Sequence, residues 1–287
     1  KESMLRLVAR RFPALSRSFS ATATDTVKYE VTKNGVATLT LNRPEKHNSL
    51  NDEVIAGLSA GINAAAQDQA VRVLFLNAEG VSFCSGADLA AFLKSREQKP
   101  DEVERSSTQL SQMLHALNTL RVPTIAMVQG PTFGGGVGLV SCCDMAVGIK
   151  DVTTFSLSEV KIGMIPATIS PYVVAAMGNR AARRYFVTGE LIDASSAQNI
   201  GLLSHVASDA AEMTAWANAR AQDLLRNGPH AVAKSKQLVF DVAHKTVDDE
   251  LIAETARRLV AVRLHDESKE GISAFLEKRK ANWVTKL

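Results

Sequence analysis

The sequence predicts an α/β fold in which strands and helices alternate around a buried sheet. Two apolar runs, residues 71–76 and 123–128, are rich in β-branched side chains and have the length of buried strands. Each run precedes a glycine-containing turn and then a segment with helical periodicity, an alternation that is typical of a sheet covered by helices. With 46% hydrophobic residues in a chain of 287, there are enough apolar side chains to bury a sizeable core.

The first predicted elements are a β-hairpin and a helix. Residues 27–31 and 36–41 alternate between apolar and polar side chains, and the Asn-Gly pair between them is a typical hairpin turn. Ser49 or Asn51 then caps a helix that runs to about residue 67. The elements expected after it are strand 71–77, helix 87–120, strand 124–129, helix 134–142, strand 144–149 and helix 171–178.

The C-terminal part of the chain is expected to be entirely helical, because strand patterns stop after about residue 208. Gly228-Pro229 separates the first two of its helices. The expected helices are 209–227, 229–245, 247–265 and 267–283. The sequence pattern leaves two roles open for these helices: they either cap the body of the same chain or form a surface for oligomerisation.

Residues 1–24 have the composition of a mitochondrial presequence, which is basic, rich in hydroxylated residues and poor in acidic ones. Leu5, Val8 and Phe12 fall on one face of a helix that Pro13 interrupts. We therefore expect these residues to direct import into the mitochondrial matrix. A disordered basic tail is the alternative.

The rest of the chain is nearly neutral, because residues 1–24 hold enough basic side chains to account for the whole net charge of +3. No nucleic-acid partner is expected of such a body. The cysteines, Cys84, Cys142 and Cys143, fit a reducing compartment, and the adjacent pair lacks the spacing of a zinc site, so we expect no metal. No apolar stretch of about 18 residues occurs in the sequence, so no membrane span is expected.

The two glycine-containing turns, residues 83–89 and 130–138, point to a site for negative charge. Glycine at a strand-to-helix junction lets backbone N–H groups approach a ligand closely, and the N-terminus of a helix carries partial positive charge. Two such junctions can direct two N–H donors at one oxygen. This arrangement stabilises an enolate or another oxyanion.

The sequences of both turns resemble the crotonase superfamily, also called the enoyl-CoA hydratase/isomerase family. Other segments resemble the family's motifs in the same order along the chain, namely residues 42–50, 143–166, 188–203 and 270–283. The resemblance implies a crotonase-type spiral of ββα units over residues 25–208. It also implies that the helices of residues 209–287 pack on neighbouring subunits to give a homotrimer or homohexamer.

The resemblance further implies hydration of a 2-enoyl-CoA thioester, with coenzyme A as part of the substrate and no separate cofactor. The backbone N–H groups of Ala87 and Gly135 match the family's two oxyanion donors, and Glu159 matches an acid/base residue. Asp88 either takes part in catalysis or caps and pairs structurally. The positions assigned to substrate and coenzyme A are Lys46, Ser85, Gly86, Asp88, Gly134, Gly138, Phe275 and Lys278, the last two reaching a neighbouring subunit's CoA.

The chain departs from the two-carboxylate hydratases at Gly138, where the family pattern has a second glutamate. Three explanations stay open: Glu159 carries both proton transfers, an anion such as bicarbonate binds near Gly138, or a carboxylate of the substrate positions water. We also expect a pocket lined by Phe155, Ile162 and Ile165 to raise the pKa of Glu159 by desolvation.

The finer sequence pattern resembles hydratases of carboxylated isoprenoid enoyl-CoAs, a group that includes 3-methylglutaconyl-CoA hydratase of leucine breakdown. This resemblance depends on residues 134–139, 142–146 and 166–173. The expected activity is thus hydration of a branched or carboxylated enoyl-CoA. One alternative is a Δ3,Δ2-enoyl-CoA isomerase, which a single glutamate favours. The other is a non-catalytic acyl-CoA-binding or RNA-associated protein of the same fold.

Overall fold

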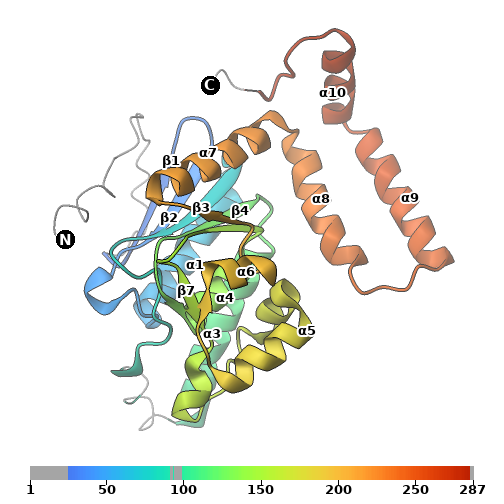
Figure 1. The fold of residues 1–287 in the computed structure, drawn as a ribbon. Helices are drawn as coiled ribbons and strands as arrows, with labels where there is room; N and C mark the ends of the chain where they lie inside the picture. Colours follow the sequence, from blue (N-terminus) through green and yellow to red (C-terminus); the bar gives the residue numbers. More distant parts are fainter. Residues whose placement is uncertain (1–24, 91–92, 94–98, 285–287) are drawn as a thin grey trace.

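The computed structural model describes residues 25–90, 93 and 99–284, which form a body of sheet and helices and a projecting arm of helices (Figure 1). The expected presequence, residues 1–24, lies outside the described residues. Within the described part of the chain, no helix is both long enough and apolar enough to span a membrane.

A six-stranded sheet forms the centre of the body. The first pair of strands is antiparallel and all other neighbours are parallel. The predicted hairpin is confirmed, with Gly35 of its turn at a φ of 83°. The strands, in spatial order, are β1 (Val27–Val31), β2 (Val36–Leu41), β3 (Val73–Ala78), β4 (Thr124–Val128), β6 (Met145–Ile149) and β9 (His205–Ala207).

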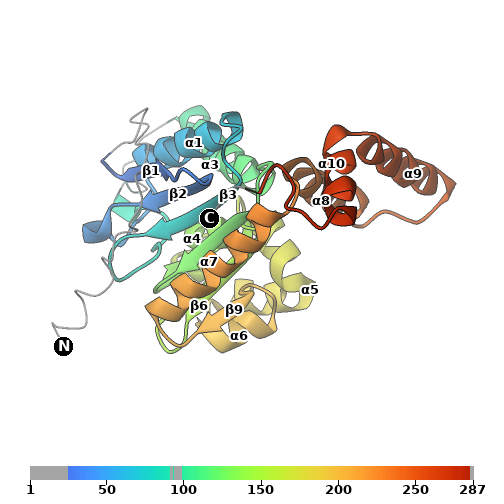
Figure 2. The ribbon, with the colours of Figure 1, turned by 90° about the horizontal axis from the view of Figure 1, so that it is seen from above.

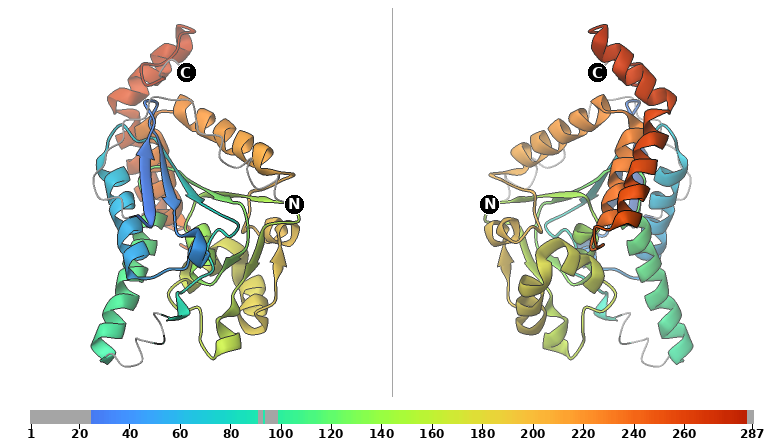
Figure 3. Two further views of the ribbon diagram at one scale, coloured as in Figure 1. Left: turned by 90° about the vertical axis from the view of Figure 1, so that its left-hand side faces the viewer. Right: turned by 90° about the vertical axis from the view of Figure 1, so that its right-hand side faces the viewer.

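Helices cover both faces of this sheet, and successive side chains along each strand point to opposite faces. In β3, Leu74 and Leu76 join the core on one face, whereas Val73 and Phe75 join the core on the other. The first face is covered by α1 (Asp52–Gln67), α3 (Pro100–Asn118), α4 (Gly135–Ser141), α5 (Ser170–Thr188) and α6 (Ala194–Asn199). The other face is covered by α7 (Ala210–Arg226), drawn in orange in Figures 2 and 3.

A second, three-stranded sheet carries the segments around the predicted site. Its strands have only two or three residues, too few for a periodic pattern in the sequence. Phe133 pairs with Ser156, and the Gly134 amide donates to the Ser156 carbonyl oxygen at 3.0 Å. This pairing brings the glycine-rich turn beside the segment that leads to Glu159. The strands are β5 (Thr132–Phe133), β7 (Thr154–Ser156) and β8 (Ile192–Asp193).

Several predicted helix boundaries are wrong. Helix 87–120 is not one continuous helix: Ala87 pairs with Leu50 as an extended bridge, Leu89 and Ala90 are helical, and after the non-helical Lys99 a separate helix, α3, runs from Pro100 to Asn118. Helix 171–178 ends too early, because the chain kinks at Gly178 (φ 77°) and α5 continues to Thr188. Helix 267–283 is too long, because the chain turns back after Leu276. This reversal lets the Trp283 indole N–H donate to the Arg226 carbonyl oxygen at 3.1 Å.

Helices α8 (Pro229–Val242), α9 (Asp249–Arg263) and α10 (Asp266–Leu276) form the arm, which projects from the body beyond α7 (Figures 1 and 2). Neither α8 nor α9 contains a buried residue. Burial in the arm is thus slight, with Ala274 of α10 as its buried apolar residue among those described, and polar contacts connect its helices.

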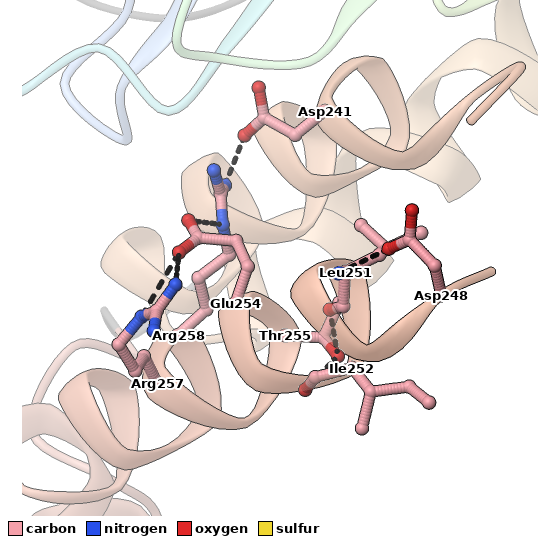
Figure 4. Close-up of polar contacts among 8 residues, drawn as sticks. All are labelled: Asp241, Asp248, Leu251, Ile252, Glu254, Thr255, Arg257 and Arg258. Atoms are coloured by element: carbon pink, nitrogen blue, oxygen red, sulfur yellow. Dashed lines mark hydrogen bonds and ion pairs between the residues drawn. The ribbon is translucent and has the colours of Figure 1, made fainter. Parts of the chain in front are cut away.

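An arginine joins the two long helices of the arm (Figure 4). Arg258 of α9 pairs with Asp241 of α8 and donates to Glu254 of its own helix at 2.8 Å. Asp248 caps α9 by accepting from the Leu251 amide at 2.9 Å. These contacts fix α8 and α9 as an antiparallel pair.

A partly buried ion pair attaches the arm to the body. The Lys236 ammonium of α8 donates to the Asp144 carboxylate at 2.7 Å, and only 10% of the Lys236 side chain is exposed. The same carboxylate oxygen accepts from the backbone amide and the hydroxyl of Thr124 at the start of β4. The Asp144 side chain is 27% exposed, so a partly buried ion pair ties the arm to the central sheet.

Replacing Lys236 by methionine should release the arm, since the Asp144 carboxylate then loses its cation. Breaking a buried pair in this way typically costs about 3 kcal/mol, which urea denaturation would measure. Limited proteolysis should also cut faster between α7 and α8. The control is Lys269→Met, whose pair with Asp266 is almost fully exposed and is worth less than about 1 kcal/mol. Equal behaviour of the two variants would contradict the attachment.

Candidate active site

The two predicted turns lie against each other. The Phe133 amide donates to the Cys84 carbonyl oxygen at 2.8 Å, which pairs the chain entering the second turn with the chain entering the first. A Cβ atom built on Gly86 would lie 3.6 Å from the Gly134 Cα atom and 3.0 Å from the Phe133 carbonyl oxygen. Gly86 and Gly134 also have positive φ angles of 87° and 49°. A side chain on Gly86 would crowd the second turn, and a side chain on Gly134 would crowd the Glu159 carboxylate.

The amides of Ala87 and Gly135 each come one residue after this contact. The Gly86 carbonyl accepts from Leu50 and the Asp88 amide donates to Leu50, so the Ala87 N–H is directed to the other side of the chain. Gly135 is the first residue of α4, and its N–H has no acceptor within the helix. Neither amide donates to an acceptor in the described part of the protein. Two unengaged N–H donors therefore flank the contact of the two turns.

Glu159 lies on a short 3-10 helix, η2 (Ser158–Ile162), and its carboxylate borders the same contact. Its Oε1 atom lies 3.0 Å from the position of a Cβ atom on Gly134, and its Oε2 atom is buried with no hydrogen-bond partner among the described residues. Desolvation raises the pKa of this carboxyl above its usual range. A partly buried carboxyl with one buried oxygen that has no such partner is suited to accept and return a proton.

The expected lining of the Glu159 pocket is partly wrong. Phe155 is fully buried, but Ile162 and Ile165 are 58% and 72% exposed. The chain leaves η2 through Gly163 with a φ of 74°, and both isoleucines stand at the protein surface on either side of that turn. The expected direction of the Glu159 pKa shift is nevertheless confirmed.

Gly138 lies one turn of α4 beyond Gly135, and an apolar side chain fills the space above it. A Cβ atom on Gly138 would overlap the Ile169 side chain and would lie 3.7 Å from a methyl carbon of Leu114. Ile169 is only 2% exposed. The anion expected near Gly138 stays a prediction, and it has no room directly above the Gly138 Cα atom.

Asp88 is engaged in an ion pair. Its carboxylate accepts from the Arg43 guanidinium at 2.8 Å and from the Ala90 amide at 3.2 Å. The exposed fractions of the Arg43 and Asp88 side chains are 17% and 15%. Of the roles considered for Asp88, this geometry favours structural pairing.

The structure separates the residues expected to bind coenzyme A into two groups. Ser85 lies in the first turn, where its amide donates to the His47 carbonyl oxygen, and the exposed Lys46 ends a 3-10 helix next to it. Phe275, which is 83% exposed, and Lys278 belong to the arm, at the opposite end of the molecule in Figures 1 and 2. The structure does not bring these two residues to the site of their own chain.

Three residues near the site were not predicted from the sequence: Arg43, Leu50 and Ile169. The first two lie in the motif of residues 42–50, which signals the family but not which of its side chains contact the turn. A Cβ atom on Gly135 would lie 2.7 Å from a methyl carbon of Leu50, so this side chain packs beneath the donor turn. No signal in the sequence links Ile169 to Gly138.

Comparison with known proteins agrees with this geometry. A family model described as enoyl-CoA hydratase/isomerase matches residues 31–286. Enoyl-CoA hydratase ACTT6 of Alternaria alternata is 32% identical over 248 residues, which cover 86% of this chain and 80% of that protein. Enoyl-CoA isomerase/hydratase fer4 of Mycosarcoma maydis is 31% identical over 255 residues, which cover 86% and 91% of the two chains.

Solved structures agree as well. The crystal structure of an enoyl-CoA hydratase from Shewanella pealeana has a TM-score of 0.86 and 33% identity, over 90% of this chain and 96% of that chain. The chain therefore belongs to the enoyl-CoA hydratase/isomerase family. The expected crotonase-type fold with a helical C-terminal region is confirmed, and so is an enzyme of the enoyl-CoA hydratase class.

Replacing Gly134 by alanine should lower kcat by about 100-fold, because the added methyl group displaces the Glu159 carboxylate. The control is Gly178→Ala, which also places alanine at a positive φ angle but has no atom within 4 Å of the added methyl group. Both variants should lose about 1–2 kcal/mol of stability from backbone strain, and only Gly134→Ala should lose activity. Equal kcat values in the two variants would contradict the placement of Glu159.

Glu159→Gln should raise the melting temperature at neutral pH. A carboxyl whose folded pKa is raised stabilises the protein fully below its unfolded pKa of about 4.3, and this stability is lost as pH rises through the folded pKa. The gain from glutamine should therefore shrink toward pH 4. For Glu190, whose pKa is lowered by the hydrogen bond from Arg184, the pH dependence should have the opposite sign. Melting curves across this pH range test both signs.

Proposed function

We propose that this protein hydrates 2-enoyl-CoA thioesters, with Glu159 as its acid/base residue. The observation that carries the proposal is the partly buried Glu159 carboxyl beside the contact of Gly86 and Gly134, with its Oε2 atom buried and without a hydrogen-bond partner among the described residues. The thioester oxygen would accept from the Ala87 and Gly135 amides, which stabilise the negative charge that develops on it. Losing one such donor typically costs about 2.7–4 kcal/mol of transition-state stabilisation.

A single glutamate can carry out both proton transfers of the hydration. The Glu159 carboxylate takes a proton from water while the water oxygen bonds to C3, and the electron pair of the double bond moves toward the thioester. The protonated Glu159 then delivers that proton to C2, which restores the carboxylate. Packing of Ile169 over Gly138 supports this reading, because it leaves no space there for a second carboxylate.

We further propose a branched or carboxylated acyl group, such as that of 3-methylglutaconyl-CoA. The sequence resemblance in residues 134–139 and 166–173 supports this choice. An apolar contact of Gly138 with Ile169 also favours it, because a glutamate there would repel a carboxylate of the substrate.

The second candidate is a Δ3,Δ2-enoyl-CoA isomerase, in which Glu159 would move a proton from C2 to C4 without water. The single carboxyl favours this reaction, and the relative from Mycosarcoma maydis is named for both activities. A non-catalytic acyl-CoA-binding or RNA-associated role is the third candidate. The buried Oε2 atom of Glu159, which has no hydrogen-bond partner among the described residues, disfavours it, since a buried polar atom without a partner is costly to keep without a chemical role.

We propose a homotrimer or homohexamer in which the arm packs on a neighbouring subunit. The arm exposes many large apolar side chains, and Phe275 and Lys278 can then contribute to CoA binding only in another copy. Import into the mitochondrial matrix is proposed from the composition of residues 1–24 alone. Apolar residues exposed on the arm include Val239, Ile252, Leu259, Val260, Leu264 and Ile272.

An absorbance assay with crotonyl-CoA, 3-hexenoyl-CoA and 3-methylglutaconyl-CoA separates the candidates. Hydration removes the absorbance of the conjugated enoyl thioester, whereas isomerisation of the 3-enoyl substrate creates it. Wild type should hydrate 3-methylglutaconyl-CoA fastest, and Glu159→Gln should lower kcat by about 10²–10⁴-fold with little change in CoA-ester binding.

Each other outcome excludes part of the proposal. Faster turnover of 3-hexenoyl-CoA than of either 2-enoyl substrate would assign the isomerase. Turnover of none of the three would favour the non-catalytic role. A wild-type rate in Glu159→Gln would exclude Glu159 as the acid/base residue.

A further inference from the structure

The segment of residues 47–50 forms the support on which the first donor turn lies. The Ser85 amide donates to the His47 carbonyl at 2.9 Å, the Leu50 amide donates to the Gly86 carbonyl at 2.8 Å, and the Asp88 amide donates to the Leu50 carbonyl at 2.9 Å. These bonds lie on both sides of Ala87 along the chain. The direction of the Ala87 N–H therefore depends on how firmly these two segments stay paired.

Arg43 connects both partners of this pairing. Its Nη1 atom donates to the Asp88 carboxylate at 2.8 Å and to the Ser49 hydroxyl at 3.3 Å. The two charged side chains are mostly buried, with exposed fractions of 17% and 15%, so water screens their attraction weakly. A charge-assisted bond of this length is among the stronger contacts available to a loop.

The backbone of Arg43 is itself held in place. Its amide donates to the Asn48 side-chain oxygen at 2.8 Å, and the Asn48 amide group donates to the carbonyl oxygens of Glu79 and Ser82 at 2.8 and 2.9 Å. Asn48 is 1% exposed and has a φ of 54°, in the left-handed region that asparagine adopts more readily than most other residues. The loop is thus anchored to the chain just before the first turn, and Arg43 extends this anchor to Asp88.

We propose that Arg43 and Asp88 are positioning residues that hold the Ala87 N–H on the thioester oxygen. Asp88 follows Ala87 directly. The ion pair of its carboxylate with Arg43 therefore restrains the peptide between Ala87 and Asp88, which adjoins the donor N–H. Neither side chain contacts the substrate in this scheme. The inference rests on the proposed function, since it assigns these residues a part in the oxyanion site. Catalysis by an oxyanion site depends on donors that are held in place before the charge develops.

The test compares Asp88→Asn and Arg43→Lys with a matched control. Asp88→Asn keeps the shape of the side chain and an oxygen for the Ala90 amide but removes the charge, and Arg43→Lys keeps the charge but removes the guanidinium donors. Both are mild enough for a folded protein to be expected. The control is Arg184→Met, which removes an exposed ion pair with Glu190 of the same 2.8 Å length on α5.

Two measurements distinguish positioning from simple stabilisation. The first is the division of the effect between kcat and KM for the best enoyl-CoA substrate. The second uses 4-(dimethylamino)cinnamoyl-CoA, whose absorption band moves to longer wavelength when its carbonyl oxygen accepts hydrogen bonds. We expect both variants to lose about 10- to 100-fold in kcat with KM within about threefold, and to show a smaller red shift. Arg184→Met should match wild type in both.

The inference is overturned if the variants keep the full red shift and wild-type kcat, or if they lose stability alone. The proposed function fails separately, if wild type shifts the band of the bound chromophore but turns over no enoyl-CoA. In that case the red shift of the variants still tests the positioning of Ala87. If Arg43→Lys does not fold, Asp88→Asn decides the question by itself.

Discussion

The contact between Gly86 and Gly134 is the constraint on which the site depends. Both residues have positive φ angles; a side chain on Gly86 would press on the backbone at Phe133, and one on Gly134 would press on the Glu159 carboxylate. Their approach brings together two amides from different strand-to-helix junctions and leaves just enough space for the Glu159 carboxylate. The short second sheet exists to maintain this approach, since its pairing of Phe133 with Ser156 joins the glycine-rich turn to the glutamate segment.

Patterns within short stretches of the sequence predicted those elements whose structure depends mainly on neighbouring residues. The hairpin around Gly35 follows from alternation and turn residues, the helix capped by Asn51 from capping, and β3 and β4 from apolar runs, whereas the three-residue β9 of the same sheet was not predicted. The donor turns and Glu159 came from family motifs. Ile169 and Arg43 could not be predicted in their roles, because each acts through a contact between distant segments that leaves no periodic signal. The extended Ala87 was missed for the same reason.

The arm and the body differ in the interactions that stabilise them. The body buries apolar side chains on both faces of its sheet, whereas α8 and α9 bury none and depend on Lys236 and Arg258 for their polar contacts. Helices with so little burial gain most of their stability from a surface that covers them. A neighbouring subunit would supply that surface and receive Phe275 and Lys278 at its CoA site. Folding of the arm and completion of the site would then be coupled to assembly.

The apolar packing above Gly138 affects whether one carboxyl can both take a proton from water and deliver a proton to carbon during hydration. Glu159 must be ionised to take a proton from water and protonated to deliver it to carbon, so its pKa has to lie closer to neutrality than that of an exposed glutamate. Burial moves the pKa in that direction. A second carboxylate nearby would raise it further, because its negative charge disfavours ionisation of Glu159. Ile169 fills the space above Gly138, so Glu159 does not face this repulsion in the proposed single-glutamate mechanism.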